Sequence, residues 1–389
     1  MAETCIQLFE EKYYPEIFVD AAERTILYFV EHEGRIAELW KKEWNRYLEQ
    51  IAVQQRDYGA EPVAEINISF LYTSLEEGKP EFRADSYGEG GYIFKPCIAS
   101  MSLPAGWLTG ELAEMEACLN ARAAEEGMRG IVRPAACEVM KRRALQCLLY
   151  YFAGRMKYLI REVLNPAYLA GIEKAEVFVI RFGEYMDWQK PLFAILPEVD
   201  ISDCAKGTVL RFRRFPAVRW RETVFAGLDF TQAVFADCTF SRVVMEDCVL
   251  NDCIFDGCVF EQVTIKGAQM AGVLFKGCEM RDTVFSGRMS GAGMQPEEEE
   301  SSGSGEGTGQ RAEDDGGSEE ESGLEYFEPA EFAGCSFKDV AFAGCDLCGA
   351  VVVNCEAENV EIRGGDVRDS DFRKMEGVIF RGEVQDGVL

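Results

Sequence analysis

The chain has 389 residues, enough for two domains of ordinary size. It carries 68 acidic and 40 basic residues, a formal net charge of −28, and 48 % of it is hydrophobic. This composition indicates a folded protein, and its acidity argues against direct binding of nucleic acid. The charge is uneven, because residues 1–220 carry −6 and residues 221–389 carry −22.

The N-terminus lacks the basic and apolar regions of a secretory signal, and no stretch approaches the ~20 apolar residues of a membrane helix. We therefore expect the 15 cysteines to be free thiols, because disulfides persist mainly in secreted proteins. The expected location is the cytoplasm, without contact to a membrane.

The sequence of residues 1–205 predicts a mixed α/β domain, which we call the head. Apolar residues recur with helical spacing in four segments, which we predict as helices: 18–30, from 36 onward, 111–126 and 133–164. Three segments are predicted strands, the first two forming a hairpin: 63–72, 82–87 and 175–185. The glycine-rich sequence 88–92 does not match a dinucleotide-binding pattern and is interpreted as a loop between strands.

The head offers few groups for catalysis. His32 is the only histidine of the chain, which excludes histidine-based triads and multi-histidine metal sites. The head contains no phosphate-binding loop, nucleophile elbow or Cys-x-x-Cys pair. We predict no catalytic residue, no cofactor and no metal, and hence no enzyme, although a site built only from Asp, Glu and Tyr stays open.

A basic junction at 206–220 follows the head and contains four arginines: Arg211, Arg213, Arg214 and Arg219. They form either a collar that pairs with acidic neighbours or a recruitment site for an acidic partner. The sequence leaves both interpretations open.

Beyond the junction, a large apolar residue recurs at every fifth position. The first block, at 221–287, runs from Phe225 to Phe285, and the second block, at 328–375, runs from Phe332 to Phe372. A small or medium-sized residue stands two positions before each. A period of five fits neither a helix nor a strand, but it fits a chain that extends briefly, turns a corner and repeats.

Segments such as Cys238-Thr-Phe240-Ser-Arg, Cys258-Val-Phe260-Glu-Gln and Cys335-Ser-Phe337-Lys-Asp resemble the pentapeptide-repeat family. The resemblance covers the C-terminal part alone and implies a right-handed quadrilateral β-helix with four repeats per coil. The expected fold is therefore an α+β N-terminal domain followed by this all-β solenoid.

Four repeats per coil would place residues that are 20 apart above one another. Phe235, Phe255 and Phe275 should form an aromatic column. The cysteines at 238, 258 and 278 should form one thiol column, and those at 335 and 355 another. We interpret these thiols as small buried core residues and not as metal ligands.

The residue before each large inward residue should point outward. In the first block these positions are largely β-branched, and they form two apolar strips that we propose as a protein-interaction surface: Val234, Ile254 and Leu274, and Val224, Val244 and Val284. Two explanations are open. The β-branched residues are there because they favour an extended backbone, or the strips are covered by the head or by a partner. In the second block the outward residues form a candidate acidic face: Asp346, Asp366, Glu356, Glu361 and Asp371.

An acidic segment at 288–327 separates the two blocks, and its composition predicts a disordered insertion. The distance of 47 positions between Phe285 and Phe332 is not a multiple of five, so the phase of the repeat should be lost there. Residues 376–389 are expected to form a C-terminal tail.

The leading functional hypothesis is a non-catalytic scaffold or adaptor that binds a protein partner through its β-helix faces and its head, with homo-oligomerisation left open. The alternative comes from the resemblance, because some pentapeptide-repeat proteins mimic DNA and protect or inhibit a type II topoisomerase, gyrase. An enzyme housed in the head is the lesser alternative.

Overall fold

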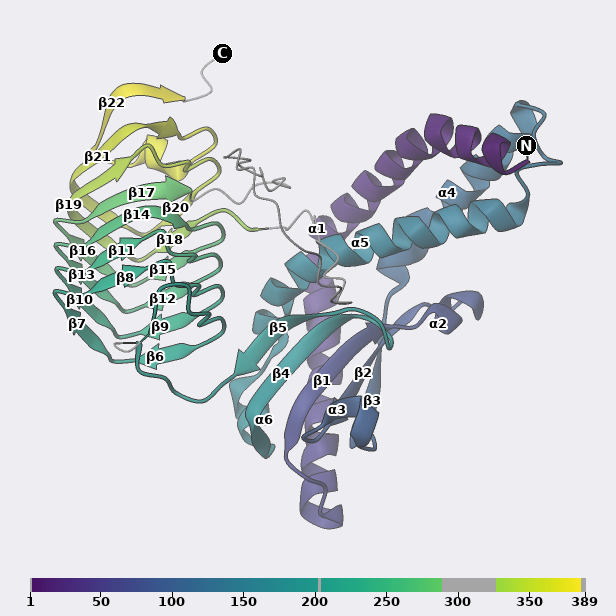
Figure 1. The fold of residues 1–389 in the computed structure, drawn as a ribbon, viewed down its shortest axis with the longest axis horizontal. Helices are drawn as coiled ribbons and strands as arrows, with labels where there is room; N and C mark the ends of the chain where they lie inside the picture. The colour runs from purple at the N-terminus through teal and green to yellow at the C-terminus, as the bar shows by residue number, and fades with distance from the viewer. Residues whose placement is uncertain (1, 202–203, 289–326, 386–389) are drawn as a thin grey trace, which may run out of the picture.

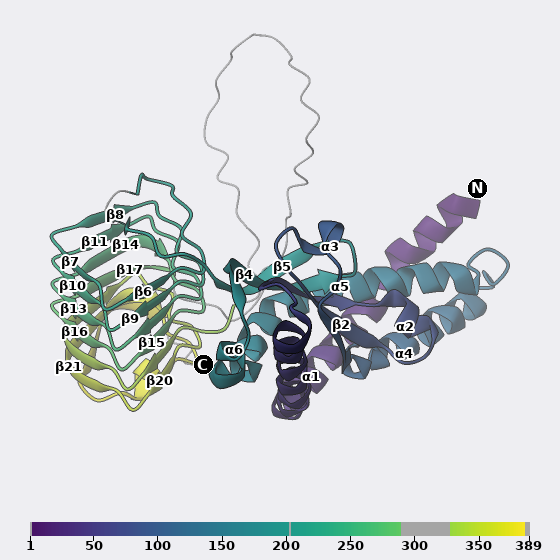
Figure 2. The same ribbon diagram turned by 90° about the horizontal axis from the view of Figure 1, so that it is seen from below.

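The computed structural model describes residues 2–201, 204–288 and 327–385. It consists of an α/β head and a β-helical solenoid that lie side by side (Figure 1). A view from below shows that the long helices of the head extend away from the solenoid (Figure 2).

Three long helices form the helical layer of the head: α1 (Ala2–Tyr58), α4 (Gly106–Glu125) and α5 (Pro134–Val163). Helix α1 contains both of the helices predicted before residue 58, without the break expected between them. The helix continues because its buried stripe runs through Phe29, Ile36 and Trp40. The remaining helices are short: α2 (Tyr72–Glu76), α3 (Gly91–Phe94), α6 (Pro166–Ala170) and the 3-10 helix η2 (Asp371–Lys374).

A five-stranded sheet with the order β3-β2-β1-β4-β5 completes the head. Its strands are β1 (Val63–Phe70), β2 (Glu81–Tyr87), β3 (Ala99–Pro104), β4 (Lys174–Glu184) and β5 (Gln189–Ile195). Only β1 and β4 run parallel, and every other neighbouring pair is antiparallel. The predicted hairpin is confirmed as β1 and β2, and the strand predicted at 175–185 as β4, whereas β3 and β5 were not predicted.

The two faces of this sheet differ in chemistry. One face carries buried residues such as Ile68, Phe82 and Phe182 and belongs to one core cluster with Trp40 of α1 and Phe152 of α5. The opposite face carries polar residues on the central strands: Glu65, Asn67, Ser69, Arg83, Asp85 and Arg181. Alternation along each strand produces this division.

The solenoid has four faces, which we number in chain order. Face 1 is a six-stranded parallel ladder of β6 (Arg214–Pro216), β9 (Val234–Ala236), β12 (Ile254–Asp256), β15 (Leu274–Lys276), β18 (Glu331–Ala333) and β20 (Val351–Val353). Face 2 contains β7 (Arg219–Arg221), β10 (Thr239–Ser241), β13 (Val259–Glu261) and β16 (Glu279–Arg281).

Face 3 contains β8 (Val224–Ala226), β11 (Val244–Glu246), β14 (Thr264–Gln269), β17 (Val284–Arg288) and β22 (Val378–Gln385). The long strands β19 (Ser336–Ala343) and β21 (Glu356–Asp366) continue faces 2 and 3 in the later coils. Face 4 is formed by isolated bridges, such as Asp229 to Val249 and Asp346 to Asp366. The quadrilateral β-helix is thus confirmed.

Stacking at a spacing of 20 residues is confirmed by the aromatic column. The ring centroids of Phe235 and Phe255 lie 4.8 Å apart, and those of Phe255 and Phe275 lie 4.9 Å apart. The column continues across the acidic segment, because the Phe275 and Phe332 rings lie 5.0 Å apart at an interplanar angle of 5°. The predicted loss of phase is therefore wrong for the described residues, and both blocks belong to one solenoid.

The cysteines at 238, 258, 278, 335 and 355 form a single column and not the two that we expected, because β16 pairs with β19 across the acidic segment. Each thiol donates a hydrogen bond to the carbonyl oxygen of the large residue one coil earlier, from Cys238 to Phe215 at 3.0 Å and from Cys335 to Phe275 at 3.3 Å. The described part of the chain contains no group of three or more His, Cys, Asp or Glu side chains that could hold a metal ion.

The solenoid extends beyond the sequence repeat at both ends. Part of the expected junction forms the first coil, since β6 pairs with β9 and β7 pairs with β10. Part of the expected C-terminal tail forms β22, which pairs with β21. The acidic insertion predicted at 288–327 falls, apart from its two end residues, outside the described residues. Among the described helices, none is long and apolar enough to span a membrane.

Candidate binding faces of the solenoid

Helix α5 of the head packs along the corner between faces 4 and 1. The Lys157 ammonium lies 2.5 Å from the Asp252 carboxylate, and Arg161 donates to Gln232 at 3.5 Å. Lys157 and Arg161 are one helical turn apart, which corresponds to a rise of about 6 Å. Their partners are one coil apart, about 4.8 Å. The near match lets successive turns of α5 meet successive coils.

Tyr158 extends this contact to the later coils. Its hydroxyl donates a short hydrogen bond to Asp252 and accepts one from the backbone N–H of Glu328 at 3.0 Å. Burial, together with the nearby Asp252 carboxylate, raises the pKa of Tyr158 far above its usual value, so the hydroxyl stays protonated. A Cβ at Gly272 would lie 2.7 Å from this hydroxyl oxygen, so only glycine leaves room for it.

The strip of Val234, Ile254 and Leu274 lies on face 1, directly beside this junction. The three residues are paired in register, with Arg214 one coil before them and Glu331 one coil after them. All three are half-buried. Each follows, by two positions, a corner residue that α5 approaches. This strip therefore lies next to the head and offers a partner limited access.

The strip of Val224, Val244 and Val284 lies on face 3, across the tube from face 1. The three valines stack in register, with Thr264 between Val244 and Val284. Val224 is 61 % exposed and Val284 is 39 % exposed. The outward column of face 3 is thus a rigid, β-branched surface that the described part of the head leaves uncovered at Val224 and Val284.

The candidate acidic residues do not share a face. Asp346 and Asp366 lie together on face 4, but Glu356 lies on face 2, Glu361 on face 3 and Asp371 in η2. Several are neutralised locally. Arg368 donates to Asp366 at 2.6 Å, and this hydrogen bond lowers the pKa of that carboxyl. Glu361 pairs with both Arg363 and Arg381.

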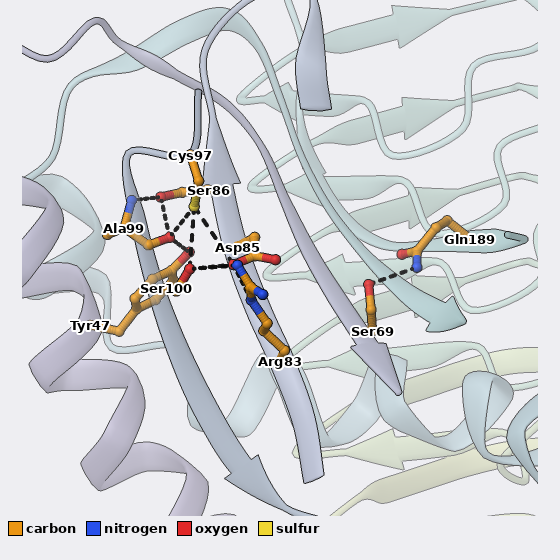
Figure 3. A network of polar contacts seen from close by, with 9 residues as sticks. All are labelled: Tyr47, Ser69, Arg83, Asp85, Ser86, Cys97, Ala99, Ser100 and Gln189. Carbon is orange, nitrogen blue, oxygen red and sulfur yellow. Dashed lines mark hydrogen bonds and ion pairs between the residues drawn. The ribbon is translucent and has the colours of Figure 1, made fainter. Parts of the chain in front are cut away.

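The polar face of the head sheet holds a dense side-chain network that invites a catalytic interpretation (Figure 3). Buried Asp85 accepts hydrogen bonds from Arg83 at 2.8 Å and from Ser100. The nearby Cys97 thiol donates to the Ala99 carbonyl at 3.0 Å. Burial raises the pKa of Cys97, which makes it a poor nucleophile at neutral pH. The network fits a structural role.

One functional residue was missed by the sequence analysis. Asp252 occupies the same corner position as Asp237 and Asp247, and all three have a positive φ, between 52° and 55°. The sequence therefore indicates a turn residue in each case. Only Asp252 is buried against the head. Equally little in the sequence indicated that Lys157, in the middle of a helix, contacts the solenoid.

A family model named pentapeptide repeats matches residues 244–287 and 335–373, with eight copies of the repeat. The C-terminal part of this chain belongs to the pentapeptide-repeat family. The matched segments are the coils whose stacking is described above, and the family leaves the head unexplained. No curated protein sequence matches the chain significantly.

Solved structures that are similar to part of this chain include full-length QnrB1, described as a plasmid-mediated fluoroquinolone resistance protein. It is 14 % identical over 46 % of this chain and 93 % of its own, with a TM-score of 0.17. A second is HetL, involved in heterocyst differentiation regulation in the cyanobacterium Nostoc, 10 % identical over 45 % of this chain and 87 % of its own, with a TM-score of 0.10. Likenesses this weak carry no information about function.

Proposed function

We propose that this protein is a non-catalytic scaffold or adaptor that presents face 3 of its pentapeptide-repeat domain to a protein partner. The observation that carries the proposal is the column of Val224, Val244 and Val284, held in register by parallel strands and exposed at Val224 and Val284. Rigid apolar surface of this kind usually marks an interaction site. A rigid ladder also loses little conformational entropy on binding.

The attachment of the head supports the same proposal. The buried pair of Lys157 and Asp252 joins α5 to the corner between faces 4 and 1. Because faces 2 and 3 meet at the opposite corner, the head and a partner on face 3 would occupy different sides of the tube. The head then orients the solenoid and stays free to make a second contact through its own surface, which is the arrangement an adaptor requires.

The acidic columns do not favour a DNA mimic acting on a type II topoisomerase. Duplex mimicry needs acidic groups continued along one side of the rod, whereas here Glu356, Glu361 and Asp371 lie on different faces. Arginines also pair with two of the strongest candidates, Glu361 and Asp366.

The proposal can be tested with tagged protein and matched variants. V224K/V284K places charge on face 3 at residues that are 61 % and 39 % exposed. The control V209K/V353K makes the same change elsewhere, at residues that are 62 % and 43 % exposed. Exposed substitutions of this kind change stability little. Quantitative mass spectrometry of captured proteins from the native host should show a partner that is lost with V224K/V284K and kept with V209K/V353K. An unchanged set of captured proteins would refute the proposal.

A further inference from the structure

Several outward cations on the solenoid pair with an acid one coil away. Arg242 lies 2.5 Å from Glu222, Lys266 lies 2.7 Å from Glu246, and Lys338 lies 3.0 Å from Glu358. Each of these pairs is 20 residues apart, and Lys276 and Asp256 form a looser pair of the same kind at 3.6 Å. Stacking thus matches opposite charges along the outside of the tube.

Arg214 and Arg219 do not follow this pattern. Their neighbours in the next coil are Val234 and Thr239, which carry no charge. Both arginines are exposed, and neither has an ion-pair partner among the described residues. They belong to the first coil of the solenoid, so no earlier coil supplies an acid. Two exposed guanidinium groups on adjacent faces of the first coil are therefore left without an ion pair to the described residues.

Arg221 adds a third positive charge beside them. Its neighbour in the next coil is Ser241, and its nearest carboxylate, Glu222, is 3.9 Å away and already pairs with Arg242. Arg219 and Arg221 flank the inward Trp220 on face 2, and Arg214 lies around the corner on face 1. Residues 206–221 contain six basic residues and no acidic one, in a chain with a net charge of −28.

The other two arginines of the predicted junction have structural roles. Arg211 lies 2.5 Å from Asp229, and Arg213 donates to the carbonyl oxygen of Pro197. The collar interpretation therefore accounts for Arg211, in its pair with Asp229, and leaves Arg214 and Arg219 unexplained. The division is what one expects if the second pair faces something outside the chain.

We propose that Arg214, Arg219 and Arg221 form a docking site for a short acidic peptide segment of a partner protein. Guanidinium groups bind carboxylates with paired hydrogen bonds, and three of them on one edge suit successive Asp or Glu side chains. The site lies on faces 1 and 2 and is independent of the column on face 3.

The surrounding charges favour a peptide over a nucleic acid. Glu261 lies two coils above Arg221, and Asp256 lies two coils above Pro216. Two coils span about 10 Å, which is close to the screening length at physiological salt. A long polyanion that ran along the tube would meet these carboxylates. A short acidic segment that follows the first coil stays clear of Glu261 and Asp256, although it runs beside Glu222 and one coil below Asp237.

Fluorescence anisotropy with a labelled hexaglutamate peptide tests the site on the full chain. R214E/R219E should weaken binding at least tenfold. R281E/K338E makes the same change of charge where acids already stand nearby, since Arg281 pairs with Glu279 and Lys338 with Glu358, and should weaken binding less than threefold. Raising the salt from 50 to 300 mM should also weaken binding, because screening reduces the attraction between exposed charges.

Three outcomes would overturn the proposal. Equal loss of binding in the two variants would show a general effect of charge. Equal or tighter binding of a single-stranded DNA with six phosphates would reassign the site to nucleic acid. If removal of residues 296–323 raised the affinity tenfold in the wild type but not in R214E/R219E, the occupant would be the chain's own acidic segment and not a partner.

Discussion

The Lys157 ammonium lies 2.5 Å from the Asp252 carboxylate, and the two side chains are only 3 % and 1 % exposed. The pair joins the middle of a head helix to one corner of the solenoid. Removing two charges from water is costly, and a buried pair repays this cost only when its geometry is well satisfied. Such a pair therefore fixes one register between α5 and the coils more than it adds stability.

Replacing one of the two charged residues should destabilise the contact between head and solenoid. K157M leaves the Asp252 carboxylate buried with only the Tyr158 hydroxyl for compensation, and we expect a loss of about 3–5 kcal/mol in the free energy of unfolding. The double variant K157M/D252N should lose less than the sum of the two single variants, because it removes both charges. Urea unfolding of the four proteins measures this difference. Additive losses would show that the residues do not interact.

Gly272 should tolerate alanine less well than Gly277. Both have a positive φ, at 68° and 59°, so each substitution carries the same backbone strain. A Cβ at Gly272 would lie 2.4 Å from an Asp252 oxygen and 2.7 Å from the Tyr158 hydroxyl, whereas a Cβ at Gly277 meets nothing within 4 Å. We expect G272A to lower the melting temperature by several degrees more than G277A. Y158F should recover part of the difference, and equal effects of G272A and G277A would contradict the contact.

The solenoid should lose stability at alkaline pH through its buried thiols. Burial raises the pKa of Cys345 to about 11, from an ordinary value near 9. Because the folded-state pKa is the higher one, this contribution is complete below pH 9 and is lost as the pH rises from 9 to 11. Unfolding free energies measured from pH 8 to 11 should fall less steeply in C345A than in the wild type. Equal slopes would show that this thiol does not titrate with unfolding.

The acidic segment should be dispensable for the fold of the solenoid. The stacked partners Phe285 and Phe342 are 57 residues apart, where an uninterrupted coil would have 20. Deletion of residues 290–326 therefore brings Phe327 five positions after Phe285 and restores the repeat. We expect a folded protein with an equal or slightly higher melting temperature, because a shorter loop costs less to close. Loss of the β-sheet signal in circular dichroism would contradict the continuous register.

The solenoid could be predicted from the sequence because each fifth residue reports the same physical constraint. Phe235, Phe255 and Phe275 stack as expected, since one large side chain per repeat fills the interior. The phase after Phe285 could not be predicted, because the return point is set by pairing of β18 on β15 and not by a count of residues.

The head and the junction were much less predictable. The edge strand β3 is rich in serine and ends at Pro104, so it lacks the β-branched pattern of a strand. Asp252 could not be distinguished from Asp237, because both occupy corner positions that require a positive φ. The contact between domains depends on where α5 meets the tube, and a repeat pattern carries no information about that position.

The most direct test of the scaffold proposal is site-specific photo-crosslinking from face 3. A photoreactive amino acid at Val244, in the centre of the column, is compared with one at Val209, an exposed valine on face 4. After irradiation in the native host, mass spectrometry should identify one protein joined at position 244 and absent at position 209. Recovery of the same products from both positions, or of none at 244, would contradict a partner on face 3.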